Sequence, residues 1–166
     1  MADSGQGRAR ARLATAEDLD ALVAIETART QGLSRTYLDL QEQGDFSVIV
    51  GLLDDAIAGR VILDLRPIDG VLVPELKLLW VAKEARRQGL GAVMTGYLED
   101  LAVDLGYDEI FLGVNPDDPA AIPLYISMDY TPTGEHRNPV NVSVVDADQT
   151  ENGAMEAIYR KSLRIR

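Results

Sequence analysis

The sequence contains no cysteine and a single histidine, His136. Without cysteine the chain has no disulfide, no thiolate nucleophile and no cysteine-ligated zinc, and one histidine excludes a histidine-rich metal site. Apolar residues make up 46% of the chain but occur in runs of only a few residues, far below the roughly 20 that cross a bilayer. The N-terminus has arginines but no apolar segment typical of a signal peptide. We therefore expect a cytoplasmic protein that binds neither a metal nor a membrane.

Positive charge is also scarce. The chain has 16 Lys and Arg against 27 Asp and Glu, a net charge of −11, and seven of the basic residues lie in residues 1–12 and 160–166. The sequence between these ends carries 9 basic and 26 acidic residues, a net charge of −17. So acidic a body repels phosphate backbones, and we expect no nucleic-acid partner. The same charge would attract a cationic substrate, or would serve only solubility or adaptation to salt.

The length of 166 residues suits one domain. Residues 1–12 are rich in Gly, Ala and Arg without apolar periodicity, which predicts a mobile arm before a domain of residues 13–166. From 90 to 105, apolar residues recur at alternating spacings of three and one, which predicts an amphipathic helix ending at Gly106. The remaining predicted helices cover 15–26, 34–43 and 119–128, the last of them capped by Asp118. The predicted strands cover 46–53, 57–65, 73–82, 108–114, 130–133 and 157–163, and the first two join as a hairpin at Asp54 and Asp55.

This order of elements predicts an α/β fold with a mixed sheet. It leaves the polar residues 134–153 as a long connection. A loop of about twenty residues is long for a structureless segment. It is either a flap that closes over a substrate or a mobile segment, and the sequence does not choose between them.

A strand that leads into a basic, glycine-containing turn directly precedes the 90–105 helix. Lys83, Arg86 and Arg87 are three of the nine basic residues of the acidic body. Free N–H groups and the helix dipole make a helix N-terminus attractive to anions, and Gly89 and Gly91 would let a diphosphate approach the backbone closely. The alternative is a solvated turn without a ligand. Neither a P-loop nor a G-x-G-x-x-G pattern is present, which argues against nucleotide sites of those types.

This turn resembles the signature of the Gcn5-related N-acetyltransferase (GNAT) family. The pattern Arg86-x-x-Gly89-x-Gly91 matches the family's Q/R-x-x-G-x-G/A and has the same strand–turn–helix context. Asn115 ends the next predicted strand, at the position of a family asparagine. Tyr125 closes an A-x-x-L-Y sequence, which is the pattern of the family's following helix. Together with the order of elements, the resemblance covers about nine-tenths of the chain.

The resemblance implies a single GNAT-like domain, a mixed and mostly antiparallel sheet flanked by helices, with acetyl-CoA as co-substrate. In the family, the signature turn holds the pyrophosphate, and the strand before it splays at a bulge and pairs its backbone with the pantetheine arm. A residue of the next strand contacts the cofactor from the other side. The implied cofactor-binding residues are Leu79, Trp80, Val81, Arg86, Arg87, Gln88, Gly89, Leu90, Gly91, Ala92 and Asn115.

Acetyl transfer to an amine needs a base, an acid and an oxyanion donor. An amine with a pKa near 10 must lose a proton before it attacks, and the departing thiolate accepts one. Family members often use a carboxylate on the strand 73–82 as the base, which here implies Glu75; the alternative is an edge-strand charge facing solvent. The family tyrosine that protonates the thiolate corresponds to Tyr125, whose alternative is a core aromatic. A backbone N–H near Trp80 or Val81 would stabilise the oxyanion.

Two positions depart from the family pattern. Pro123 falls inside the helix of Tyr125, where it removes one backbone donor. Asp129 stands where the family usually ends this helix with glycine. Because aspartate tolerates the left-handed conformation, we expect the turn to be preserved.

The sequence thus predicts an acetyl-CoA-dependent N-acetyltransferase that acetylates a primary amine by direct attack in a ternary complex. A covalent thioenzyme is impossible without cysteine. The acceptor stays open: a polyamine, an amino sugar, or a lysine or N-terminal amine of a protein. The alternative function is a non-catalytic acyl-CoA-binding sensor, which would keep residues 86–92 but need neither Glu75 nor Tyr125. Homodimers are common in the family, and the sequence leaves the oligomeric state open.

Overall fold

The computed structural model describes residues 8–139, 144 and 155–164. Its elements in chain order are β1 (Ala9–Leu13), the 3-10 helix η1 (Ala16–Asp18), α1 (Leu19–Ala24), α2 (Leu33–Glu42), β2 (Phe46–Leu53), β3 (Ala56–Asp64), β4 (Glu75–Val81), the 3-10 helix η2 (Lys83–Ala85), α3 (Leu90–Asp104), β5 (Glu109–Val114), α4 (Ala121–Ser127), β6 (Thr131–Arg137) and β7 (Glu156–Ser162). Helices and strands therefore occur where the periodicity predicts them, with two exceptions described below.

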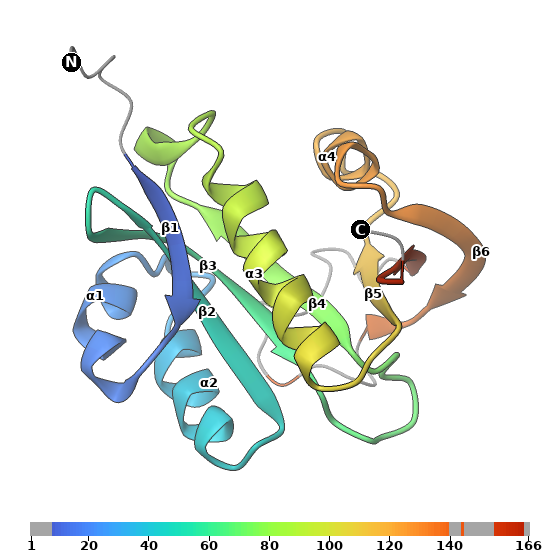
Figure 1. Ribbon diagram of the computed structural model, residues 1–166, viewed down its shortest axis with the longest axis horizontal. Helices are drawn as coiled ribbons and strands as arrows, with labels where there is room; N and C mark the ends of the chain where they lie inside the picture. Colours follow the sequence, from blue (N-terminus) through green and yellow to red (C-terminus); the bar gives the residue numbers. More distant parts are fainter. Residues whose placement is uncertain (1–7, 140–143, 145–154, 165–166) are drawn as a thin grey trace.

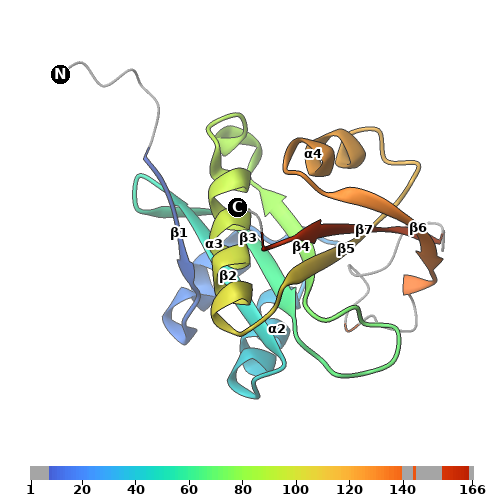
Figure 2. The same ribbon diagram turned by 45° about the vertical axis from the view of Figure 1, so that its right-hand side comes forward.

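The strands form one seven-stranded sheet in the order β1-β2-β3-β4-β5-β7-β6 (Figure 1). The β4–β5 pair is parallel, and the other described pairs are antiparallel. One apolar cluster lies between the sheet and α3, and a second lies between the sheet and α2 on the opposite face (Figure 2). The predicted fold, a mixed and mostly antiparallel sheet flanked by helices, is confirmed.

Helix α3 packs on the sheet through the apolar stripe that the sequence predicts. Leu90, Met94 and Leu98 are almost completely buried. The strands under the helix carry glycine at the closest approach, since a Cβ at Gly51 would lie 2.7 Å from the Met94 sulfur. A Cβ at Gly59 would meet the Met94 methyl group at 2.9 Å. The absence of these side chains allows α3 to lie directly on β2 and β3.

The β2–β3 hairpin turns at Asp54 and Asp55, as predicted. Their φ angles are 51° and 68°. Positive φ at both central residues is the type I′ geometry, whose twist matches that of the flanking strands. Aspartate is one of the few residues that adopt this conformation readily.

Strand β1 corrects the prediction of a mobile arm over residues 1–12. Residues 9–13 pair antiparallel with residues 49–53 of β2 and form an edge of the sheet. Arg12 donates to both carboxylate oxygens of Asp18, at 2.7 and 2.9 Å, and Arg10 forms an ion pair with Asp55. Alanines alternate with arginines here; they pack on the sheet but contribute too little hydrophobicity to mark a strand. Residues 1–7 lie outside the described residues.

Strand β6 corrects the start of the predicted loop over residues 134–153. The strand continues to Arg137, whose cross-strand partner is Glu156 on β7. Its residues are almost all exposed because β6 is the other edge of the sheet, so the apolar alternation that predicts a strand is missing. Residues 140–143 and 145–154 of the predicted loop lie outside the described residues, and both alternatives, a flap and a mobile segment, stay predictions.

We predict that Met94→Ala lowers the free energy of unfolding by about 2–5 kcal/mol, because the side chain is fully buried and its loss leaves a cavity under α3. Val93 on the same helix is 37% exposed, and Val93→Ala should change stability by less than about 0.5 kcal/mol. Urea unfolding of both variants measures the difference. Equal losses would contradict this account of α3 packing.

Candidate functional site

The parallel strands β4 and β5 pair only over the first two residues of β4, which lie beside the middle of β5. Glu75 is the partner of Phe111 and Leu76 the partner of Leu112. Beyond these two pairs β4 continues beside β3 to its end at Val81. The side of β4 that faces away from β3 therefore has no paired strand along residues 77–81 among the described residues. An unpaired strand edge offers backbone donors and acceptors to an extended ligand.

A backbone irregularity lies where the two strands separate. Leu78 has a φ of 57°, and the β3–β4 register shifts between Arg60 and Ile62. A branched, non-glycine residue in the left-handed region is uncommon and strained. The bulge bends β4 away from β5, so the splay implied by the family resemblance is present.

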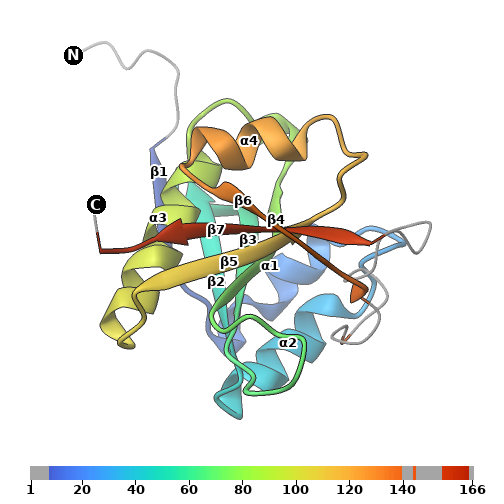
Figure 3. The same ribbon diagram turned by 90° about the vertical axis from the view of Figure 1, so that its right-hand side faces the viewer.

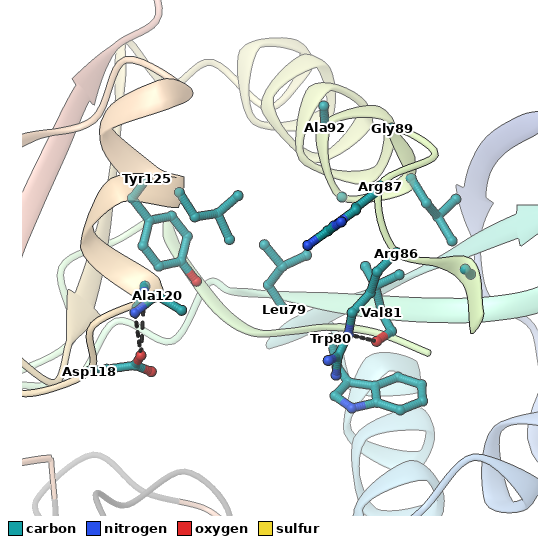
Figure 4. Close-up of a pocket in the computed structure, with 15 residues that line it drawn as sticks. Leu79, Trp80, Val81, Arg86, Arg87, Gly89, Ala92, Asp118, Ala120 and Tyr125 are labelled. Carbon is teal, nitrogen blue, oxygen red and sulfur yellow. Dashed lines mark hydrogen bonds between the residues drawn. The ribbon is translucent and has the colours of Figure 1, made fainter. Parts of the chain in front are cut away.

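A cavity of about 670 Å³ opens beside this part of β4. Its walls are the end of β4, the turn that follows, the first turn of α3, and α4 (Figure 4). The lining residues are Leu79, Trp80, Val81, Ala85, Arg86, Arg87, Gly89, Leu90, Gly91, Ala92, Asp118, Ala120, Ala121, Leu124 and Tyr125. Nine of the eleven predicted cofactor-binding residues thus line one cavity.

The turn before α3 presents a positively charged wall to this cavity. Gly89 caps α3 in the left-handed conformation, with φ 80°. The Arg86 Nε donates to the carbonyl of Val81 at 3.1 Å, while the side chain of Arg87 extends toward Leu79 (Figure 4). A Cβ at Gly91 would have only Val81 Cγ2 within 4 Å, at 3.9 Å. The fold does not require glycine at 91, and the missing side chain enlarges the cavity.

The opposite wall belongs to α4. Asp118 Oδ1 accepts hydrogen bonds from the N–H groups of Ala120 and Ala121, at 2.9 and 3.2 Å, which confirms the predicted cap. Tyr125 points its hydroxyl toward the cavity (Figure 4). Burial, and then the charges of Asp118 and Glu156, raise the pKa of Tyr125 to about 12. The phenol therefore keeps its proton at neutral pH.

Glu75 lies at the base of the split and does not line the cavity. It is only 2% exposed, so the alternative of an edge-strand charge facing solvent is wrong. Arg137 on β6 donates to both carboxylate oxygens, to Gly70 O at 2.9 Å and to Glu156 Oε1 at 3.1 Å. The sequence contains no local signal for this pairing, because Arg137 follows Glu75 by 62 residues.

Two predicted cofactor-binding residues lie outside the lining. Asn115 directly follows β5, and its Oδ1 accepts from the N–H of Asp117 at 3.0 Å. Gln88 donates from its side chain to the carbonyl of Glu84 at 3.2 Å. Both side chains therefore stabilise turns here. Asp118 lines the cavity instead; the sequence marks it only as a helix cap.

A comparison with protein families matches residues 15–130 to the acetyltransferase (GNAT) family. The chain belongs to the GNAT family. It is therefore an acyltransferase whose co-substrate is acetyl-CoA. The cavity fits that co-substrate, because an unpaired strand edge, two arginines and a helix N-terminus meet there.

Solved structures of other GNAT proteins share the fold. An N-acetyltransferase from Staphylococcus aureus Mu50 superposes with a TM-score of 0.70 at 18% identity, covering 95% of this chain and 99% of that chain. The ribosomal-protein-S18-alanine N-acetyltransferase from Escherichia coli has a TM-score of 0.69 at 20% identity, with 96% of each chain covered. The yncA protein from Salmonella typhimurium, solved with its cofactor acetyl-CoA, has a TM-score of 0.69 at 19% identity, again with 96% of each chain covered. No relative was found among curated proteins.

Two further searches cover only the described residues. None of their helices is long and apolar enough to cross a membrane. Within the same ranges, no group of three or more His, Asp or Glu side chains could hold a metal ion.

We predict that acetyl-CoA at one hundred times its Kd stabilises this GNAT protein by about 2.7 kcal/mol, which raises Tm by roughly 5–11 °C for a chain of this size. Gly91→Glu should abolish the shift, because its carboxylate would face the anionic co-substrate. The apo protein should be no less stable, since the fold leaves room for the side chain and the helix dipole favours a negative charge.

Gly91→Ala is the matched control, because it adds a small uncharged group and should keep most of the shift. Melting curves of the three proteins with and without acetyl-CoA make the comparison. A full shift in Gly91→Glu would show that the ligand binds elsewhere.

Proposed function

We propose that this chain transfers the acetyl group of acetyl-CoA to a primary amine by direct attack in a ternary complex, and that Tyr125 protonates the departing thiolate. The observation that carries the proposal is that the hydroxyl of Tyr125 opens on the same cavity as the signature turn and the unpaired end of β4. A tyrosine that only filled the core would not line this cavity.

The reaction forms one bond and breaks another. The amine nitrogen, after losing a proton to a base, bonds to the acetyl carbon, and the carbon–sulfur bond breaks. The thiolate takes its proton from the Tyr125 phenol, which is protonated at neutral pH. The nitrogen loses its second proton as the amide forms, and a proton returns through solvent to the Tyr125 phenolate. No step uses an enzyme thiol, in keeping with a chain that has no cysteine. A backbone N–H near Trp80 or Val81, next to the bulge, is the proposed donor to the thioester oxygen.

We propose Glu75 as the base that takes the amine proton, directly or through water. Its position supports this role, since Glu75 is one of the two β4 residues that pair with β5 before the strands separate. Arg137 holds both of its oxygens and so defines where the carboxylate points. The competing role is structural: the same ion pair ties the start of β4 to β6.

The acceptor is proposed only as a class. A net charge of −17 between residue 12 and residue 160 favours a cationic amine by long-range attraction, whether a polyamine, an amino sugar or a protein amine.

The remaining proposals for contacts with the cofactor, Gln88 and Asn115, rest on the family resemblance alone. A cytoplasmic location, inferred from the lack of cysteine and of long apolar runs, stays a prediction, as does the homodimer that is common in the family.

We predict that Tyr125→Phe lowers kcat by roughly 10–100-fold, at the low end for general acid–base catalysis because a thiolate leaves well even unprotonated. The Kd for acetyl-CoA should change little. Release of the CoA thiol, followed with a thiol reagent over a panel of amines, measures kcat; the protein adds no background, because it has no cysteine.

Tyr97→Phe is the control, since it removes a hydroxyl from a half-buried tyrosine on α3. An unchanged kcat in Tyr125→Phe would exclude the acid role. Cofactor binding without turnover of any amine in the wild-type protein would favour the non-catalytic acyl-CoA-binding module.

We predict that Glu75→Gln lowers kcat/KM for the amine by about 10²–10⁴-fold and changes the shape of its pH profile, because the base is lost. Glu156→Gln is the matched variant, because it removes the other carboxylate that pairs with Arg137. It should leave the shape of the pH profile unchanged. If Glu75→Gln keeps that shape and only lowers Tm, Glu75 is structural and the base lies elsewhere.

A further inference from the structure

The C-terminal end of α4 ties Tyr125 to Tyr130. The N–H of Tyr130 donates to the carbonyl of Tyr125 at 3.0 Å, and the N–H of Asp129 donates to that of Ile126 at 3.0 Å. Asp129 is left-handed, with φ 73°. These are the two hydrogen bonds and the conformation of a Schellman motif, and aspartate fills the position where the family usually has glycine.

The two rings of this motif are also in contact. The ring centroids of Tyr125 and Tyr130 lie 6.1 Å apart with the rings at 75°. Edge-to-face geometry at this distance is favourable for aromatic pairs. In a Schellman motif the residue after the left-handed one commonly packs on the last turn of the helix. Backbone and ring of Tyr130 therefore both contact Tyr125.

Tyr130 is itself held by a buried charged group. Its side chain is fully buried, and its hydroxyl donates to Glu99 Oε2 on α3 at 2.9 Å. Lys161 on β7 donates to both oxygens of Glu99, at 2.9 and 3.1 Å. The Lys161 Nζ also lies 5.7 Å from the centroid of the Tyr130 ring. We call these three residues, Glu99, Tyr130 and Lys161, the anchor group.

The anchor group differs from ordinary core packing. Burying an ion pair costs desolvation, and apolar residues of similar volume often give equal or higher stability. Helix α4, in contrast, has no fully buried residue of its own. The anchor group joins Tyr130, which follows α4, to α3 through Glu99 and to β7 through Lys161 (these elements are labelled in Figure 3).

We propose that Glu99, Tyr130 and Lys161 position Tyr125, so that its hydroxyl is held at the cavity for proton transfer. This inference rests on the proposed function of Tyr125. A displacement of about 1 Å in a catalytic group can cost 10²-fold in rate, so a rigid attachment at the end of a short, shallow helix is valuable. The contact runs through the Schellman turn and the ring edge, and none of the three anchor residues lines the cavity.

Tyr130 is not a second acid in this arrangement. Burial, and then the negative charge of Glu99, raise the pKa of Tyr130 well above its usual value. The hydroxyl keeps its proton and stays a donor to Glu99. The role of Tyr130 is therefore to hold Tyr125, and of the two tyrosines Tyr125 is the one that lines the cavity.

The first test needs no acceptor. Hydrogen exchange followed by mass spectrometry is measured on the apo protein for peptides covering α4, in Tyr130→Phe, Glu99→Gln and the control Tyr97→Phe. We expect faster exchange of α4 in Tyr130→Phe, which keeps the ring and loses the hydroxyl. Glu99→Gln keeps an acceptor for Tyr130, and its α4 should exchange more slowly than in Tyr130→Phe. Exchange of β2 and β3 should stay as in the wild type.

The second test is a double-mutant cycle on the reaction. With the amine that gives the highest rate, Tyr130→Phe should lower kcat by roughly tenfold with little change in KM for acetyl-CoA. In a Tyr125→Phe background the same change should lower kcat by less than about twofold, because the residue being positioned no longer donates. The single variant Glu99→Gln, which keeps an acceptor for the Tyr130 hydroxyl, should retain most of the wild-type kcat. A purely structural role would give the same fold loss in both backgrounds.

The outcomes separate this inference from the proposed function. Unchanged α4 exchange in Tyr130→Phe, or independent effects of the two tyrosines on kcat, would overturn the positioning role while leaving Tyr125 as the acid. A normal kcat in Tyr125→Phe would overturn the acid role and this inference with it. If no amine is acetylated, the proposed function fails, and the exchange measurement decides whether the anchor group holds α4.

Discussion

The separation of β4 from β5 is the constraint on which the functional site depends. The two strands share two residue pairs and then diverge, where the left-handed Leu78 bends β4. A continuous parallel pair would use the backbone groups of residues 77–81 internally and would leave no cavity between α3 and α4. Because β4 stays paired with β3 up to Val81, the exposed edge is rigid. The signature turn follows that edge directly, so strand edge and helix N-terminus face the same space.

Buried ion pairs hold the two halves of the sheet on either side of this split. Arg137 reaches Glu75 on β4 and Glu156 on β7, and Gly113 on β5 makes room for it, since a Cβ there would lie 2.8 Å from Glu156 Oε1. Lys161 pairs with Glu99 on α3. Such pairs specify geometry more than they add stability, because each charge must be desolvated. They explain how a split sheet keeps a defined opening.

Elements with strong local patterns could be predicted from the sequence, and elements at the sheet edges could not. The apolar stripe of α3, the hairpin turn at Asp54 and the cap at Asp118 depend on neighbours within a few residues. β1 and β6 each have at least one exposed face, so their sequences show little apolar alternation. They resemble the sequences of an arm and of a loop. Within the site, the cavity-lining residues of the turn follow from a local motif, whereas the pairing of Glu75 with Arg137 does not, because the two residues lie on different strands.

By itself, the sequence determined the chemistry that is possible: no thiol route, a basic, glycine-containing turn at the start of α3, and a tyrosine on the following short helix. Only the tertiary structure decided which groups meet. Glu75 finds Arg137 62 residues away, and Tyr130 finds Glu99 31 residues away. The reason is that turns, caps and helices are selected by short-range sterics and hydrogen bonds, while side-chain partners across a sheet depend on strand order and register, which the whole chain sets together.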